Sequence, residues 1–96
     1  MKFMVTWKMH PGKLHDTLGL FSAMSPQEDE AARGDNIKML GRWHDLTRGR
    51  GVAVFETENA EALSTYALKW NGVMDLDVSI VLDDDETRSI GQHMSK

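Results

Sequence analysis

The chain has 96 residues, of which 41% are hydrophobic and 27% charged, so we expect a single globular domain spanning residues 1–96. A net charge of −4 argues against a surface for nucleic acid or anionic membrane, which would need clustered lysine and arginine. Cysteine is absent, which excludes disulfides, zinc–thiolate sites and thiol catalysis. The chain opens with an alternating segment and holds no long apolar run, so a cytoplasmic protein is the default expectation.

The first half of the chain predicts one strand and two helices. Residues 3–8 alternate between apolar and other side chains, as in a strand, and His10-Pro11-Gly12 breaks the pattern. Over about residues 13–24, apolar side chains recur at the spacing of one helix face, at Leu14, Leu18 and Phe21. Ser25-Pro26-Gln27-Glu28 then has the form of a capping box, and Gly34-Asp35-Asn36 ends the short polar helix that follows.

The second half predicts three strands and a second amphipathic helix. A strand over residues 37–45 leads through a hairpin loop to a third strand over residues 52–57. Asn59 is a good N-cap for a helix whose apolar stripe consists of Leu63, Tyr66, Ala67 and Trp70. Residues 76–82 alternate as a fourth strand, and the acidic run Asp83-Asp84-Asp85-Glu86 begins a C-terminal turn or helix.

This order of elements is β-α-β-β-α-β with one minor helix added. Two right-handed crossovers place both main helices on the same face of a four-stranded antiparallel sheet. The sequence therefore predicts an α+β fold of the ferredoxin-like class.

The parity of each strand assigns its side chains to one of two faces. One face is nearly all apolar and should carry the helices: Phe3, Val5, Trp7, Ile37, Met39, Trp43, Val52, Val54, Leu76, Val78, Ile80 and Leu82. The opposite face is half apolar in its middle, which predicts a homodimer with two sheets face to face. Its predicted interface residues are Met4, Thr6, Leu40, Arg42, His44, Ala53, Phe55 and Val81. The alternative is a monomer with a mildly apolar open sheet.

Glu56 is the one charge that falls on the predicted helix side. With a hairpin loop over residues 47–50, Glu56 would lie opposite Gly41, where the missing side chain leaves space above the sheet. A parallel neighbour of Glu56 on the first strand would lie near Trp7. The predicted ligand site is therefore an aromatic pocket with one carboxylate, formed by Trp7, Gly41, Trp43 and Glu56 under Tyr66 or Trp70. Alternatively, Glu56 ends its strand in water or accepts a hydrogen bond from an indole.

His44 and Arg42 are predicted to face away from that pocket. His44 could shuttle protons or bind a ligand, but Asp45 is its neighbour in a strand and points to the other face. We expect both residues at the rim of the dimer, paired with carboxylates such as Asp77. No pair of histidines has metal-ligand spacing, so neither a metal nor a cofactor is expected.

Five segments of the chain resemble one family of small bacterial proteins. These are Met1 to Trp7, Gly41-Arg42-Trp43-His44-Asp45, Phe55-Glu56 with Ala62-Leu63, Trp70-Asn71, and Val81-Leu82-Asp83-Asp84. The chain is similar over nearly its whole length to domain-of-unknown-function family 3303. The resemblance implies a ferredoxin-like protomer of the dimeric α+β-barrel type and supplies no activity. Similar dimeric barrels include cofactor-independent monooxygenases, haem-degrading monooxygenases and lactone isomerases, but the helix from Ala60 to Trp70 has no histidine to bind haem.

Three hypotheses for the function follow from these observations. The leading one is a homodimeric module that binds a small, partly aromatic ligand without metal or prosthetic group. The second is a cofactor-independent monooxygenase or isomerase that acts on a small phenolic substrate, with Glu56 or His44 as general base. The third is a non-catalytic interaction or scaffold protein whose interface is its function.

Overall fold

Four strands and four α-helices form within residues 1–95, the part of the chain that the computed structural model describes. In chain order the elements are β1 (Lys2–Met9), α1 (Leu14–Ala23), α2 (Pro26–Arg33), β2 (Lys38–Asp45), the 3-10 helix η1 (Leu46–Arg48), β3 (Arg50–Glu56), α3 (Ala60–Leu68), β4 (Met74–Val81) and α4 (Asp84–Met94). No helix among these residues is long and apolar enough to cross a membrane.

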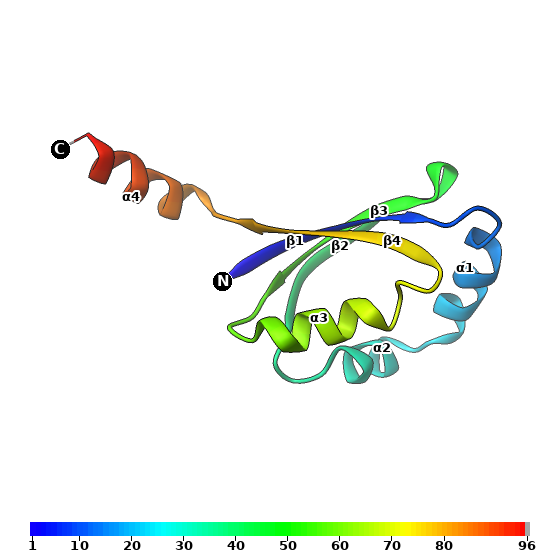
Figure 1. The fold of residues 1–96 in the computed structure, drawn as a ribbon. Helices are drawn as coiled ribbons and strands as arrows, with labels where there is room; N and C mark the ends of the chain where they lie inside the picture. Colours follow the sequence, from blue (N-terminus) through cyan, green and yellow to red (C-terminus); the bar gives the residue numbers. More distant parts are fainter. Residues whose placement is uncertain (96) are drawn as a thin grey trace.

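The sheet has the order β2-β3-β1-β4, and every neighbouring pair of strands is antiparallel. Each helical connection therefore joins two strands that have another strand between them, as in a split βαβ unit. The helices α1, α2 and α3 lie on one side of the sheet, and α4 extends beyond the end of β4 (Figure 1). The predicted α+β class and antiparallel sheet are confirmed, and the fold is consistent with the ferredoxin-like class.

The predicted helix starts are confirmed by hydrogen bonds. Ser25 Oγ accepts from the Glu28 amide at 3.1 Å, while Glu28 accepts from the Ser25 amide, so α2 begins with a complete capping box. Asn59 caps α3 by accepting from the Ala62 amide at 3.0 Å. The acidic run at Asp83 starts α4 with a second capping box, which gives that run a structural role.

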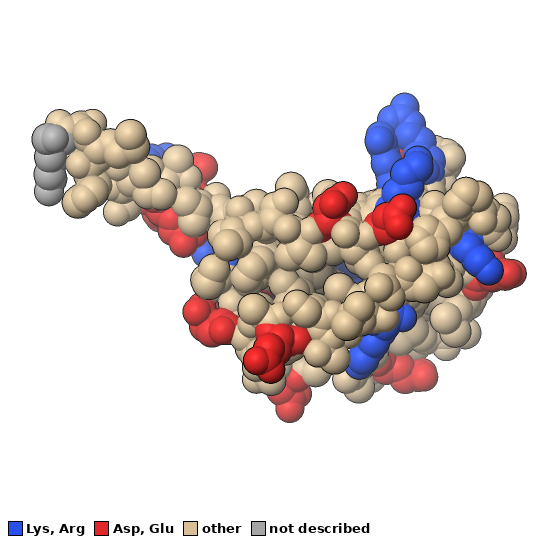
Figure 2. All heavy atoms as spheres, viewed as in Figure 1, with Lys and Arg blue, Asp and Glu red and all other residues tan. Residues whose placement is uncertain are grey.

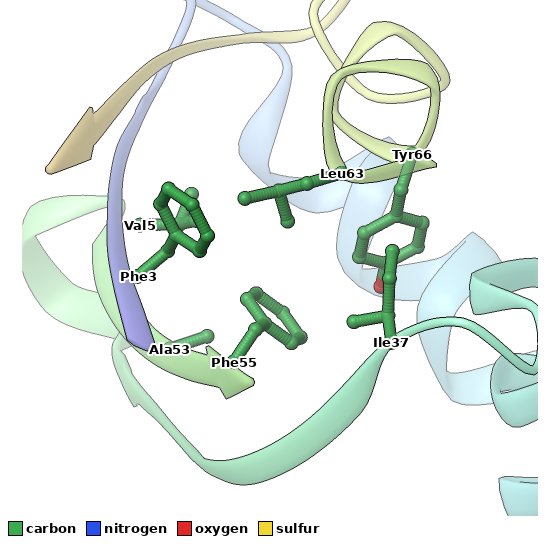
Figure 3. Close-up of a cluster of buried hydrophobic side chains, with 7 residues drawn as sticks. All are labelled: Phe3, Val5, Ile37, Ala53, Phe55, Leu63 and Tyr66. Carbon is green, nitrogen blue, oxygen red and sulfur yellow. The ribbon is translucent and has the colours of Figure 1, made fainter. Parts of the chain in front are cut away.

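The core fills the space between the sheet and α3. Phe3 and Val5 from β1 and Ala53 and Phe55 from β3 point toward Leu63 and Tyr66 of α3, with Ile37 beside them (Figure 3). The register agrees, since Phe3 pairs with Phe55 and Val5 with Ala53. The prediction that Ala53 and Phe55 lie on the face away from the helices is therefore wrong. Both alternating sets of side chains in β3 are apolar, so alternation alone did not determine which set faces the helices.

A β-bulge reverses the faces of β2 halfway along the strand. Met39 pairs with Phe55, but Gly41 rather than Leu40 pairs with the next residue, Val54. The extra residue moves Arg42 to the helix side, opposite Ala53, and moves His44 there as well, opposite Gly51. Gly41 and Trp43 consequently face away from the helices. The sequence prediction had the opposite assignment for all four of these β2 residues, because it assumed unbroken alternation.

The face of the sheet away from the helices, called the open face below, has an apolar centre. It carries Met4 and Thr6 from β1, Gly41 and Trp43 from β2, Val52 and Val54 from β3, and Ser79 and Val81 from β4. The indole of Trp43 is 62% exposed and the side chain of Leu40, at the bulge, is 44% exposed. The radius of gyration is 15.5 Å, well above the roughly 12.5 Å expected for a compact chain of this length, because α4 projects away from the sheet.

Candidate functional site

A cavity of about 100 Å³ lies between the sheet and helices α1 and α3. Its wall is mostly apolar and includes five aromatic side chains, those of Trp7, Phe21, Phe55, Tyr66 and Trp70. The polar side chains among its lining residues belong to Thr17, Arg42, His44, Asp45 and Arg50. An apolar pocket with a few convergent polar groups is the usual form of a small-molecule site.

Gly51 makes room for the tryptophan at the floor of this pocket. A Cβ placed on Gly51 would lie 2.2 Å from Cζ2 of Trp7 and 2.7 Å from the carbonyl oxygen of Trp43. The Trp7 indole therefore lies directly over Gly51 of β3, where another side chain would displace it. In this position it forms one wall of the cavity and meets the ring of His44.

His44 lies between two aromatic rings. Its imidazole is 5.6 Å from the Trp7 ring and 5.3 Å from the Phe21 ring, measured between centroids. Burial, together with the positive charge of Arg42, lowers the pKa of His44 below its ordinary value. At neutral pH this imidazole is uncharged, with one nitrogen that donates and one that accepts. Within residues 1–95 its ring forms no hydrogen bond, so both nitrogens are free to meet a ligand.

Beside His44, a buried ion cluster joins β2 to α2. The Arg42 guanidinium donates to both carboxylate oxygens of Asp29, at 2.7 and 3.3 Å, and Arg33 donates to the same carboxylate at 3.1 Å. The side chains of Arg42, Asp29 and Arg33 are only 15%, 9% and 8% exposed. Arg42 also lies over the Phe21 ring, 4.8 Å from its centroid.

Two arginines share the one carboxylate of this cluster. Burial would raise the pKa of Asp29, but the hydrogen bond and charge of Arg42, with the charge of Arg33, outweigh that effect and hold the pKa below its ordinary value. Asp29 is thus ionised at neutral pH. Burial, and secondarily the Asp29 charge, raises the pKa of the nearby Tyr66 hydroxyl, which remains protonated.

The structure brings three of the predicted ligand-binding residues together and separates the other three from them. Trp7, Tyr66 and Trp70 line the cavity. Glu56 lies at the far end of the sheet, opposite Lys38 on β2 and Lys2 on β1, with its carboxylate 3.7 Å from the Lys2 ammonium. The predicted proximity of Glu56 to Trp7 is wrong because β1 and β3 are antiparallel, which places Gly51 beside Trp7.

Gly41 and Trp43 do lie together, but on the open face. A Cβ on Gly41 would come within 2.2 Å of the Trp43 ring, so this indole covers the glycine. Of the residues predicted for the dimer interface, Met4, Thr6 and Val81 lie on the open face and Leu40 is exposed at the bulge. The others lie on the helix side, where Ala53 and Phe55 are in the core and Arg42 and His44 line the pocket.

The sequence analysis named His44 as a possible general base but placed it and Arg42 on the other face of the sheet, and it did not assign Phe21 or Asp29 to this site. One signal could have indicated the first two, since a glycine inside a strand pattern often marks a bulge, and a bulge at Leu40-Gly41 reverses the parity of everything that follows. Asp29 and Arg33 have the i,i+4 spacing of a helical ion pair, but nothing in the sequence shows that they are buried.

The described residues around the pocket form no cluster of metal ligands. Across residues 1–95, no three histidine, aspartate or glutamate side chains are grouped to hold a metal ion. Asp45, near the mouth of the pocket, pairs instead with Arg50 at 3.0 Å, and this contact lowers the pKa of the Asp45 carboxyl. Basic side chains project from the β2–β3 hairpin at this end of the molecule (Figure 2).

The fold and the cavity define a small α+β protein with a candidate ligand pocket between its sheet and its helices. The chain belongs to the family described as Domain of unknown function (DUF3303), whose model matches residues 1–95. The resemblance seen in the sequence is thereby confirmed. No curated protein matches the chain.

Proposed function

We propose that the protein binds a small aromatic molecule in the pocket between the sheet and helices α1 and α3. The observation that carries this proposal is the meeting of Trp7, Phe21 and Trp70 around a cavity with a free, uncharged His44 in its wall. The volume of about 100 Å³ is of the order of the roughly 150 Å³ that accommodates one benzene ring. A ligand with one ring, part of it in the mouth of the pocket, fits this space.

The test is a binding series on two residues that are adjacent in α1. Calorimetry with phenol, indole and benzoate should detect binding to the unmodified protein, and Phe21→Ala should weaken it at least about tenfold. Leu20→Ala is the matched control, because Leu20 is 60% exposed and does not line the cavity. Glu56→Gln and Trp43→Ala, both on the open face, should leave the affinity unchanged. Equal effects of the two α1 substitutions would contradict the proposal.

We further propose that the protein is a homodimer in which two open faces pack together, as in a dimeric α+β barrel. The support is the exposed Trp43 and Leu40 beside the apolar centre of that face. Native mass spectrometry and light scattering should give a mass of two chains. Trp43→Ser should shift the protein toward monomer, whereas Leu68→Ser, at a 66% exposed position on α3, should not. A monomer at micromolar concentration would refute the dimer but not the pocket.

A second candidate function is a cofactor-independent monooxygenase or isomerase, favoured by one observation. Of the two general bases predicted from the sequence, His44 lines the pocket, uncharged and in contact with two aromatic rings, while Glu56 does not. Oxygen uptake or a spectral change with quinol-type substrates would indicate turnover. His44→Gln should abolish it while ligand binding persists. A ligand that binds tightly without being converted would favour the binding module.

A further inference from the structure

We propose that the ligand of this pocket is an aromatic anion, such as an aryl carboxylate, whose charged group is bound by Arg42. This inference rests on the proposed function and narrows it to a chemical class. It depends on the charge and the free hydrogen-bond donors of the ion cluster behind the pocket wall.

The charges around the pocket do not cancel. Arg42 and Arg33 share the single carboxylate of Asp29, which leaves one surplus positive charge in a cluster whose side chains are at most 15% exposed. Asp45 and Arg50 at the mouth neutralise each other, and His44 is uncharged. A positive charge held away from water without a partner is unfavourable, and an anion in the adjoining cavity would compensate it.

The cluster also has hydrogen-bond donors to spare. Asp29 takes one hydrogen bond from each terminal nitrogen of Arg42, and within residues 1–95 the Arg42 Nε and the second N–H of each terminal nitrogen have no acceptor. Among the same residues, Arg33 Nε is the one buried side-chain nitrogen or oxygen without a partner. The unused Nε of Arg42 is therefore accessible, and Arg42 lines the cavity. A carboxylate is the group that such planar, paired donors bind best.

His44 and Phe21 complete the recognition of such a ligand. The Arg42 guanidinium lies over the Phe21 ring and His44 lies against the same ring, so both polar groups are fixed at one wall of an aromatic pocket. A ring held by Trp7 and Trp70 can direct its carboxylate to that wall. A neutral imidazole can donate one hydrogen bond to the carboxylate beside the arginine.

The test compares a carboxylate with its uncharged amide of the same shape. In calorimetry at pH 7.5, benzoate should bind the unmodified protein at least about tenfold more tightly than benzamide. Arg33→Met removes the surplus charge but leaves Arg42 paired with Asp29 and leaves every lining residue intact. In this variant the preference for benzoate should largely disappear while benzamide binds as before. Arg88→Met, which removes an exposed cation already paired with Asp85 on α4, away from the pocket, is the matched control and should keep the preference.

A second measurement avoids substitutions altogether. The NMR titration of the His44 ring should show a higher midpoint when benzoate is bound and no change with benzamide, because only the anion opposes the charge of Arg42. Benzamide binding as tightly as benzoate, or a preference that survives Arg33→Met, would overturn this inference and leave the aromatic pocket standing. If neither compound nor indole or phenol binds, the proposed function fails and this inference fails with it.

Discussion

The substitution Asp29→Asn tests whether the buried ion cluster holds α2 against the sheet. The Asp29 carboxylate accepts three hydrogen bonds from Arg42 and Arg33, and these link α2 to β2. α2 has eight residues, too few for an isolated helix to be stable in water, so it depends on contacts of this kind. Asparagine keeps the shape of the side chain but removes its charge, which leaves two buried guanidinium groups without a counter-ion.

The expected loss of folding stability is large for a single substitution. Removing one partner of a buried ion pair destabilises a protein by about 3–5 kcal/mol. In a domain of this size each kcal/mol lowers the melting temperature by about 4–8 °C. Taking the lower figure of each range, Asp29→Asn should lower the melting temperature by about 12 °C or more. The control is Glu30→Gln, the next residue of α2, which is exposed and should change the free energy of unfolding by less than about 0.5 kcal/mol.

The pH dependence of this stability difference shows whether the charge of Asp29 causes it. The pKa of Asp29 is lower in the folded chain than its ordinary value of 3.8, so the folded state binds the proton less readily than the unfolded state. The stabilisation is therefore fully present above about pH 4 and is lost as the pH falls through the folded pKa. Melting curves of the two proteins at fixed concentration should differ by a constant amount from pH 5 to pH 8, and the difference should shrink as the pH falls through the folded pKa of Asp29. A difference below about 2 °C at pH 7 would refute the role of the cluster.

Three further predictions concern Gly51 and His44 at the pocket and the N-cap of α3. Gly51→Ala should destabilise the protein by about 1–3 kcal/mol in urea unfolding, because the new Cβ would lie 2.2 Å from the Trp7 ring. Gly41→Ala should destabilise it clearly less, because the Cβ there meets only the exposed Trp43 indole, which can move. His44 should titrate below its ordinary value in NMR, and a titration at or above 6.5 would contradict its placement between aromatic rings beside an arginine. Asn59→Ala should cost about 1 kcal/mol in urea unfolding through loss of the α3 cap, and an unchanged midpoint would show that this cap contributes nothing.

The secondary structure could be predicted because its signals are local. Ser25 and Glu28 lie three residues apart and satisfy each other's backbone, whatever the rest of the chain does. The same holds for Asp83 with Glu86. The stripe of Leu63 and Tyr66 predicted the face of α3 that the core uses. In each case the residues that specify the structure lie within two helical turns of one another.

The faces of the strands could not be predicted in the same way. A strand assigns its faces by parity, and one inserted residue exchanges them. The bulge at Leu40 exchanged the faces of β2 in this way. In β3, Val52 and Val54 on one face are as apolar as Ala53 and Phe55 on the other. Only the pairing with β1, which is a contact between segments about fifty residues apart in the chain, settles which pair faces the helices.

The wrong assignment of the β2 faces involves the same residues as the candidate site. Arg42 and His44 lie on the helix side of the sheet, where packing alone would place apolar residues. Within residues 1–95, Arg42 keeps N–H groups that Asp29 does not use, and the His44 ring has no hydrogen-bond partner. Local sequence rules are expected to fail at functional or strained sites, because such sites keep side chains that stability would not select. The departure from pattern in β2 and the candidate site in the pocket thus involve the same two residues, and the bulge at Leu40 is what turns both toward the cavity.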